Sequence, residues 1–169
     1  MILILVSSQN KNMELAKVFN KYLQDGNTPS EIIDLVALDF PLYSSKFEND
    51  KPPVVILELA KKMEKANALI FVAPEYNGSI PPVFNNAIAW ISRAGPDWRS
   101  SFNGKPALIA THSGGGGSHV LMAMRLQLSY IGVNVMGRQI LTHKGKDLNH
   151  DSMVAVLEQL KIFASIKSN

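Results

Sequence analysis

One stretch near the middle of the chain, residues 69–91, limits the possible folds more than any other. It begins with Leu69 to Ala73, an almost wholly apolar run typical of a strand buried on both faces of a sheet. Pro74 ends this run, turn-prone residues 75–79 follow, and apolar residues recur at helical spacing from Val83. The pattern predicts a strand, an exposed loop and a helix. In parallel sheets, ligands bind at such loops.

Two details of this stretch refine the prediction for the loop and for the start of the helix. Gly78 can take a positive φ without steric cost, which suits a tight turn. Ser79 is expected to cap the following helix, with Pro81 and Pro82 in its first turn, where no intrahelical N–H is needed.

The same alternation of strand and helix runs through the whole chain. Further strands are expected at Ile2–Val6, Glu31–Leu38, Ala107–Thr111 and Val133–Leu141. Further helices are expected after residue 12 and at Val54–Ala66, His119–Ile131 and Met153–Ile166; Val54, Leu57, Ala60 and Met63 are inward candidates of the second. Right-handed crossovers then give an α/β fold with a five-stranded parallel sheet and helices on both faces. No repeat or long linker divides residues 1–169, so we expect a single domain.

Two other loops carry ligand-binding features. Residues 7–12 form a polar loop before a helix, where free N–H groups and the helix dipole favour phosphate, although the same residues are also suited to capping alone. Residues 112–118 contain four glycines, which let the backbone approach a planar ligand and direct N–H groups at it. A flexible linker is out of place between an apolar strand and a helix, so a binding loop is favoured. Both loops and loop 74–79 are expected at one edge of the sheet.

Composition excludes several classes of function. The absence of cysteine excludes disulfides and thiolate metal sites, and the four histidines lack the spacing of common zinc motifs. The net charge is +3 with scattered Lys and Arg, so no nucleic-acid surface is expected. No stretch approaches the ~20 apolar residues of a membrane span. A cytoplasmic protein is expected. The glycine tract lacks the G-K-[ST] ending of a P-loop, so nucleotide hydrolysis is not expected. His112-Ser113 does not match G-x-S-x-G, so a nucleophilic serine is not expected either.

A family resemblance adds to these patterns. Residues 74–93 read PEYNGSIPPVFNNAIAWISR. They resemble the P-E-Y-N-x-S-x-P-x-x-L-K-N-A-I-D-W-x-S stretch of the NADPH-dependent FMN reductases, which include quinone, chromate and azo-dye reductases. The match departs at Asn85, where the family usually has Lys, and at Ala89, where it usually has Asp. The resemblance runs through nearly the whole chain and implies a flavodoxin-like three-layer sandwich with strand order 2-1-3-4-5. It also implies FMN as cofactor and NADPH or NADH as electron donor.

The resemblance implies a set of cofactor-binding residues. Lys11 is expected to supply positive charge to the FMN phosphate, because the family's loop Arg is absent and Ser7 replaces its glycine; the donors there are Ser8, Asn10 and Asn12. The O4 and N5 edge of the flavin is expected against Pro74, Glu75, Tyr76, Asn77 and Gly78, and the N1/O2 edge against Ser113, Gly114, Gly115 and Gly116. Glu75 is interpreted as a loop-shaping residue. No catalytic side chain is expected, since the flavin carries the electrons.

The expected reaction is a hydride transfer from nicotinamide C4 to flavin N5, followed by reduction of an acceptor at the same open face. Quinones, free flavin, azo dyes and metal oxyanions all suit such a face, in a ping-pong mechanism. A flavodoxin-type electron carrier is the main alternative; such carriers are usually strongly acidic, whereas the pI of about 9.1 favours the reductase. A module that no longer binds FMN is a third hypothesis. The resemblance also implies a homodimer or homotetramer, with residues 88–91 either at an interface or, for Trp90, in the core.

Overall fold

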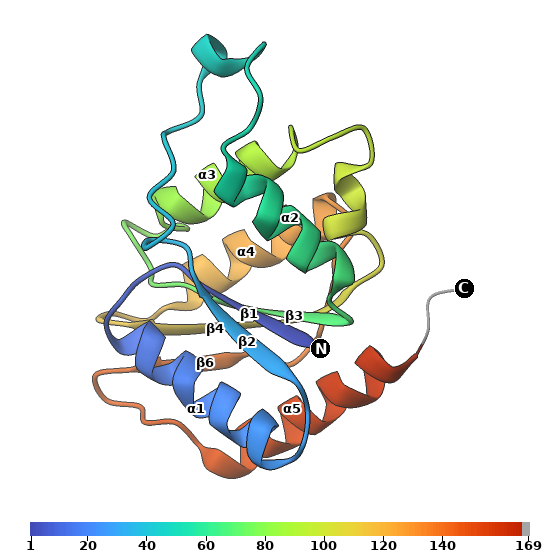
Figure 1. The fold of residues 1–169 in the computed structure, drawn as a ribbon. Helices are drawn as coiled ribbons and strands as arrows, with labels where there is room; N and C mark the ends of the chain where they lie inside the picture. Colours follow the sequence, from blue (N-terminus) through green and yellow to red (C-terminus); the bar gives the residue numbers. More distant parts are fainter. Residues whose placement is uncertain (167–169) are drawn as a thin grey trace.

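The sheet of this protein lies between two layers of helices in the computed structural model, which describes residues 1–166 (Figure 1). The strands are β1 (Ile2–Val6), β2 (Ser30–Asp34), β3 (Ala68–Val72), β4 (Pro106–Ser113), β5 (Asn134–Val135) and β6 (Ile140–His143). The helices are α1 (Lys11–Asp25), α2 (Val54–Lys65), α3 (Pro82–Ile91), α4 (Ser118–Tyr130) and α5 (His150–Ser165), with short 3₁₀ turns at Ser45–Phe47 and Trp98–Ser101.

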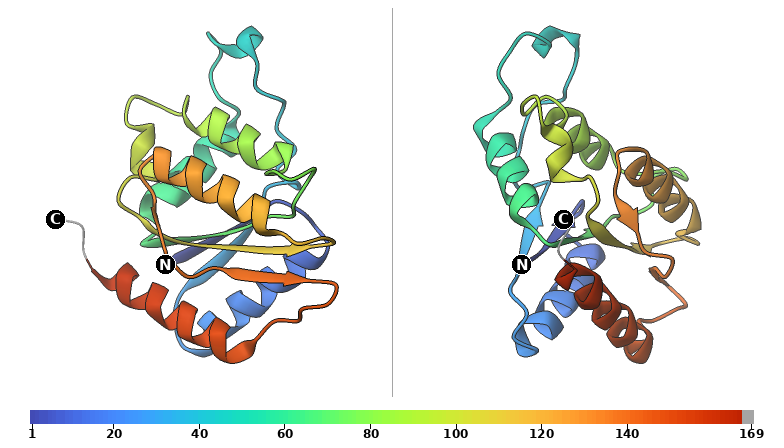
Figure 2. Two further views of the ribbon diagram at one scale, coloured as in Figure 1. Left: turned by 180° about the vertical axis from the view of Figure 1, so that it is seen from behind. Right: turned by 90° about the vertical axis from the view of Figure 1, so that its right-hand side faces the viewer.

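All the strand pairs of the sheet are parallel. The strand order is β2-β1-β3-β4-β5, and β6 also pairs with β4. Helices α1 and α5 cover one face of the sheet, and α2, α3 and α4 cover the other (Figures 1 and 2). The expected α/β fold and the order 2-1-3-4-5 are therefore confirmed.

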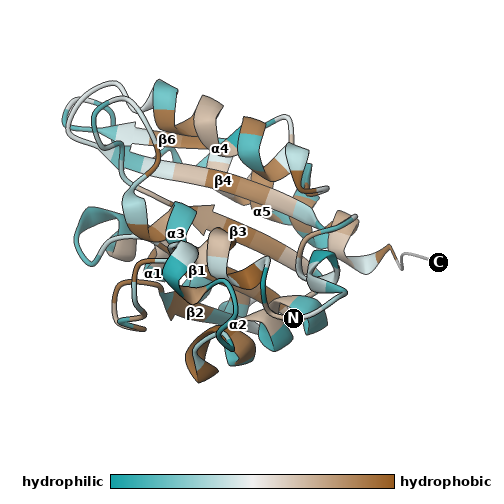
Figure 3. Ribbon diagram, turned by 90° about the horizontal axis from the view of Figure 1, so that it is seen from above, coloured by the Kyte–Doolittle hydropathy of each residue, from teal (hydrophilic) through white to brown (hydrophobic). Residues whose placement is uncertain are grey.

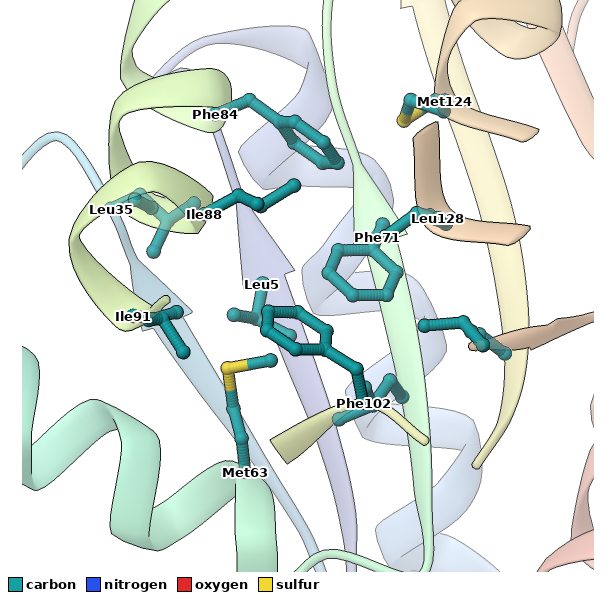
Figure 4. Packing of buried hydrophobic residues seen from close by; sticks show 14 of the residues in the cluster. Leu5, Leu35, Met63, Phe71, Phe84, Ile88, Ile91, Phe102, Met124 and Leu128 are labelled. Atoms are coloured by element: carbon teal, nitrogen blue, oxygen red, sulfur yellow. The ribbon is translucent and has the colours of Figure 1, made fainter. Parts of the chain in front are cut away.

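The alternation of side chains along each strand divides the core into two parts. In β1, Leu3 and Leu5 belong to the cluster beneath α2, α3 and α4, whereas Ile2, Ile4 and Val6 belong to the cluster beneath α1 and α5. Figure 3 shows the apolar strands and the more polar loops. In the first cluster, Phe71 of β3 packs against Phe84 of α3 with ring centroids 5.6 Å apart (Figure 4). Both faces of the sheet are thus buried, as the apolar strands predicted.

The second strand is shorter than predicted. It ends at Asp34, and residues 35–38 form a turn, so the expected strand Glu31–Leu38 is wrong in its second half. The physical reason is a local side-chain bond: Asp34 Oδ1 accepts from the N–H groups of Val36 and Ala37 at 2.9 and 3.2 Å. An aspartate that binds the backbone two residues ahead favours a turn over a strand.

The predicted fifth strand, Val133–Leu141, is divided into β5 and β6. Between them, the guanidinium of Arg125 in α4 donates to the carbonyl groups of Val135 and Met136, at 3.4 and 2.9 Å. These carbonyls bind a side chain from the helix layer, and the chain then returns to β4 at Ile140. Both pieces pair with β4, so the topology is unchanged.

Two expectations about helices are also wrong. Ser79 does not cap α3, because its N–H and C=O are both bound to Tyr76 in a turn; α3 begins at Pro82, with Pro81 at the N-cap. Val54 is 68% exposed, because the inner face of α2 is formed by Ile56, Leu59, Ala60 and Met63. Val54 is the first residue of α2 and lies outside this i, i+3, i+4, i+7 face.

Candidate functional site

Three loops meet at the carboxyl edge of the sheet. They follow β1, β3 and β4, which are consecutive neighbours in a parallel arrangement, and so all leave the sheet on the same side, at the left of Figure 1. Loops 7–10, 73–81 and 114–117 therefore lie together, as topology predicted. This edge contains all thirteen of the predicted cofactor-binding residues, on the loops or at the adjoining ends of β4 and α1.

The first loop presents a row of free backbone donors. Within residues 1–166, the N–H groups of residues 8–13 have no hydrogen-bond acceptor. The first intrahelical bond of α1 is from Glu14 N–H to the carbonyl of Asn10, and the Asn10 side chain makes no cap bond. Free N–H groups at the start of a 15-residue helix favour an anion. The loop can therefore hold a phosphate through its backbone, with the half-buried Ser8 and the exposed Asn10 side chain beside it.

Asn12 occupies a different environment from the other residues of this loop. Its side chain is only 3% exposed and is bound twice to the backbone of His112. Asn12 Nδ2 donates to the carbonyl of His112 at 2.9 Å, and Asn12 Oδ1 accepts from the N–H of His112 at 2.7 Å. This pair joins the start of α1 to the end of β4. A side-chain bond from Asn12 to phosphate requires that this pair be given up.

Lys11 supplies a positive charge at the loop, partly balanced by Glu14. Lys11 Nζ lies 2.8 Å from Glu14 Oε2, and both side chains are well exposed. This hydrogen bond, together with the attraction between the charges, raises the pKa of Lys11 and lowers the pKa of Glu14. The Lys11 ammonium at this loop is therefore already paired with a carboxylate.

The second loop is a two-residue hairpin. Tyr76 and Ser79 exchange both backbone hydrogen bonds at 3.0 Å. Between them, Asn77 and Gly78 have φ values of 50° and 75°, as the type I′ turn favoured by Asn-Gly requires. In the part of the chain that the structure describes, the N–H groups of Glu75, Asn77 and Gly78 have no acceptor. Pro74 is buried beneath the loop and Tyr76 is 51% exposed. The hairpin thus presents backbone donors beside an exposed aromatic ring.

The glycine loop is open on its outer side. A Cβ atom added at Gly114, Gly115 or Gly116 would meet no atom within 4 Å. Gly117, with φ 72°, is buried, and its Cβ would meet Thr111 Cγ2 at 3.0 Å. Ser113 is buried and its Oγ accepts from Gly115 N–H at 3.3 Å, so this side chain shapes the loop. The N–H groups of Gly114 and Gly116 have no acceptor within residues 1–166.

Glu75 links the second loop to the helix after the third. Its Oε2 accepts from the N–H groups of His119 and Val120, in the first turn of α4, at 3.1 Å each. The interpretation of Glu75 as a loop-shaping residue agrees with these contacts. The donor set of the edge fits FMN: backbone N–H groups suit a phosphate and the carbonyl and nitrogen edge of a flavin, and the open glycines leave room for a planar ring.

A fourth loop at this edge was not predicted. Because β6 pairs in parallel with the end of β4, loop 144–149 leaves the sheet beside the glycine loop. His112 Nδ1 lies 3.0 Å from Thr142 Oγ1, and a cavity of about 160 Å³ lies between Lys11, His112 and Lys146. The sequence pattern that could have indicated this loop is HKGK at residues 143–146, where basic residues follow the end of a strand.

A larger cavity, of about 910 Å³, lies at the opposite edge of the sheet. Residues around its opening include Asn67, Gly104, Lys105 and Asn134. Lys105 Nζ already donates to the carbonyl groups of Glu64 and Ala66 at 2.9 and 2.8 Å, and burial lowers its pKa. The cavity therefore offers no free cationic group from Lys105, whereas the carboxyl edge offers free donors.

Within residues 1–166, no cluster of three or more His, Asp or Glu residues could hold a metal ion. Within the same range, no helix is long and apolar enough to cross a membrane.

The fold and the edge loops define a class of protein. A parallel sheet of order 2-1-3-4-5 with helices on both faces is a flavodoxin-like fold, in which ligands bind where the strand order reverses. The sequence model described as NADPH-dependent FMN reductase matches residues 1–147. The chain belongs to the NADPH-dependent FMN reductase family. It is an oxidoreductase with FMN as cofactor and a reduced nicotinamide nucleotide as electron donor.

Several individual proteins are similar to this chain in sequence or in structure. An uncharacterized protein of Mycoplasma pneumoniae is 30% identical over 154 residues, covering 87% of this chain and 90% of that protein. A quinone reductase of Escherichia coli is 36% identical over 103 residues, but the match covers 59% of this chain and only 53% of the relative. Among solved structures, the NAD(P)H:(acceptor) oxidoreductase FerB of Paracoccus denitrificans is similar with a TM-score of 0.75 and 25% identity, covering 96% of this chain and 94% of FerB.

Proposed function

We propose that this chain transfers electrons from a reduced nicotinamide nucleotide through FMN to a small acceptor such as a quinone. The observation that supports this most strongly is the row of free N–H groups at residues 8–13, placed beside the donors of the hairpin and the glycine loop. When bound, FMN supplies the two-electron chemistry by accepting a hydride and passing it on. The same single domain, residues 1–169, would supply every part of the site.

The residues of the edge have separate roles in this proposal. The backbone of Ser8 to Asn12 binds the phosphate, and Lys11 and the side chains of Ser8 and Asn10 add charge and donors. The N–H groups of Glu75, Asn77 and Gly78 bind one edge of the ring, and those of Gly114 and Gly116 bind the other. Donors at these positions stabilise negative charge that reduction adds to the ring. Pro74, Tyr76, Ser113 and Gly115 shape the two loops.

One open face for two substrates implies a ping-pong mechanism. The nicotinamide must leave before the acceptor can bind at the same position. Initial rates measured against NADPH at several quinone concentrations should then give parallel double-reciprocal lines. Intersecting lines would show that both substrates bind together, and would overturn this part of the proposal. Free flavin, azo dyes and metal oxyanions are further acceptors to compare with the quinone.

The decisive experiment is an anaerobic absorption spectrum of the protein with FMN, before and after NADPH. Bound-flavin bands that bleach promptly with NADPH are expected. Bands that bleach only with dithionite would instead indicate a flavodoxin-type electron carrier. An unchanged spectrum of free FMN, with no protein-bound fraction, would contradict the site. NADH in a parallel sample would show which nicotinamide nucleotide is preferred.

We also propose a homodimer or homotetramer. Trp90 is 1% exposed, so the helix surface at residues 88–91 lies mainly in the core of the chain. By contrast, Met122, Leu126 and Tyr130 are 60%, 76% and 82% exposed at a spacing of four along α4. Such a stripe on one helix face suits contact with a second copy. Light scattering should give at least twice the 18.6 kDa of one chain, whereas a monomer would overturn this proposal.

A cytoplasmic location is also proposed, since reduced nicotinamide nucleotides are held inside the cell.

A further inference from the structure

The start of α4 is capped by a side chain from another loop. Gly117 stands at the N-cap and offers no side-chain bond, and Glu75, more than forty residues earlier, takes this role. Its Oε2 binds the N–H groups at the second and third positions of α4, which an N-cap side chain ordinarily binds. The Glu75 side chain is only 14% exposed, and its Oε1 lies 3.8 Å from His119 Nδ1.

Because of this contact, the N-termini of α1 and α4, which both lie at the carboxyl edge of the sheet, differ in their free backbone donors. Helix α1 begins with free N–H groups, whereas the carboxylate of Glu75 already occupies the positive end of the α4 dipole. A phosphate therefore has donors at α1 and meets a negative charge at α4. The glycine tract before α4 is thus left to contact a ring, in agreement with its open outer side.

The glycine loop has few other contacts to hold it. Among the backbone N–H groups of residues 114–117, only Gly115 has an acceptor within the described chain, the neighbouring Ser113 Oγ. The position of the loop depends on its two ends, which are β4 at Ser113 and the first turn of α4. Because Glu75 follows directly after β3 and Pro74, it ties the second of these ends to the hairpin.

We propose that Glu75 is a positioning residue that sets the separation between the hairpin donors, Asn77 and Gly78, and the glycine-loop donors, Gly114 and Gly116. This inference rests on the proposed function, because the separation matters for a ligand that contacts both loops. A ring that is held at two edges binds most tightly when the hairpin donors and the glycine-loop donors are already at the right separation. If they are not, binding must first order the glycine loop, and this entropic cost lowers the affinity. The Glu75 side chain therefore acts on FMN affinity through α4 and not through contact with the cofactor, whereas the Glu75 N–H, which every substitution of this side chain keeps, remains a donor of the hairpin.

The test compares two variants that each remove one helix cap. Glu75→Ala removes the cap of α4, and Asn149→Ala removes the cap of α5, where Asn149 Oδ1 accepts from Ser152 N–H at 2.8 Å. Both variants should lower the urea midpoint to a similar degree, because each loses one N-cap. FMN titration should show a Kd raised about 10-fold or more for Glu75→Ala and less than about 2-fold for Asn149→Ala, given the usual strength of charged hydrogen bonds. Glu75→Gln, which keeps one acceptor oxygen, should fall between wild type and Glu75→Ala.

A second readout does not depend on FMN. In the protein without FMN, hydrogen exchange of residues 114–120 should be faster in Glu75→Ala than in Asn149→Ala. If the wild-type protein binds FMN and Glu75→Ala binds it with the same Kd, the positioning role is overturned. Wild-type protein that binds no FMN would instead overturn the proposed function. In that case, unchanged exchange in Glu75→Ala would overturn the loop-holding role as well, and faster exchange would support it.

Discussion

Replacing Asn12 with leucine should lower the free energy of unfolding by about 2–4 kcal/mol, because two partly buried backbone groups lose their partner at about 1–3 kcal/mol each. Leucine has the same branched shape as asparagine, with larger methyl groups in place of the amide oxygen and nitrogen, and it has no polar atom. The N–H and C=O of His112, now bound at 2.7 and 2.9 Å, would be left unpaired between α1 and β4. Urea unfolding followed by circular dichroism measures this loss.

The same substitution should also weaken FMN binding about 10-fold or more, since a displacement of α1 relative to β4 separates the phosphate donors from the glycine loop. Asn12→Asp keeps the acceptor for His112 N–H and loses the donor, so an intermediate effect is expected. Asn20→Leu is a matched control on the same helix, because within residues 1–166 Asn20 Oδ1 accepts only from the Ser30 hydroxyl, at 2.8 Å. A stable Asn12→Leu protein with wild-type FMN affinity would show that the pair with His112 is unimportant for the site.

Trp90→Ala should cost about 3–5 kcal/mol of unfolding free energy, the usual cost of truncating a fully buried large aromatic residue. Trp90 is 1% exposed, and its Nε1 donates to the carbonyl of Pro41 at 2.7 Å. Its ring packs against Tyr43 and Phe47, with centroids 5.1 and 5.6 Å away. The substitution therefore leaves a cavity and also releases the segment that carries these two aromatic residues.

Two further variants separate these effects. Trp90→Phe keeps most of the apolar volume and loses the N–H, and should cost about 1–2 kcal/mol, mainly through that bond and the smaller ring. Pro41 keeps one partner in this variant, because Asn86 Nδ2 also donates to its carbonyl at 3.0 Å. Trp98→Phe, at a partly exposed position on the second 3₁₀ turn, is the control and should have a smaller effect. A loss below about 1 kcal/mol in Trp90→Ala would contradict the core assignment.

Much of the candidate site could be predicted because local patterns decide it. The Asn77-Gly78 pair favours the type I′ hairpin by its own backbone preferences, and the hairpin is present. The three loops could be placed at one edge because they follow strands that are neighbours in a parallel sheet. That these residues bind FMN is a proposal, with the donor geometry in its support. The loop after β6 was missed because its position depends on a strand pairing that begins only at Ala110 and Ile140.

Three of the errors, in β2, in the fifth strand and at Ser79, share one cause, which is a specific hydrogen bond that competes with the predicted element. Asp34 turns its own backbone out of β2, and Arg125 binds the carbonyls between β5 and β6. Ser79 pairs with Tyr76 and so is not available as a cap. In each case, propensity supported the predicted element, and a specific hydrogen bond decided against it.

The sequence by itself determined the α/β alternation, the strand order through the family resemblance, and the position of the binding edge. It could do so because apolar runs, turn pairs and glycine tracts act over a few neighbouring residues. Only the tertiary structure decided that the Asn12 side chain binds His112, that Glu75 caps α4 and that Trp90 lies in the core. These side chains meet partners about 45–100 residues away in the chain, and their hydrogen bonds exist only after the sheet has brought the loops together.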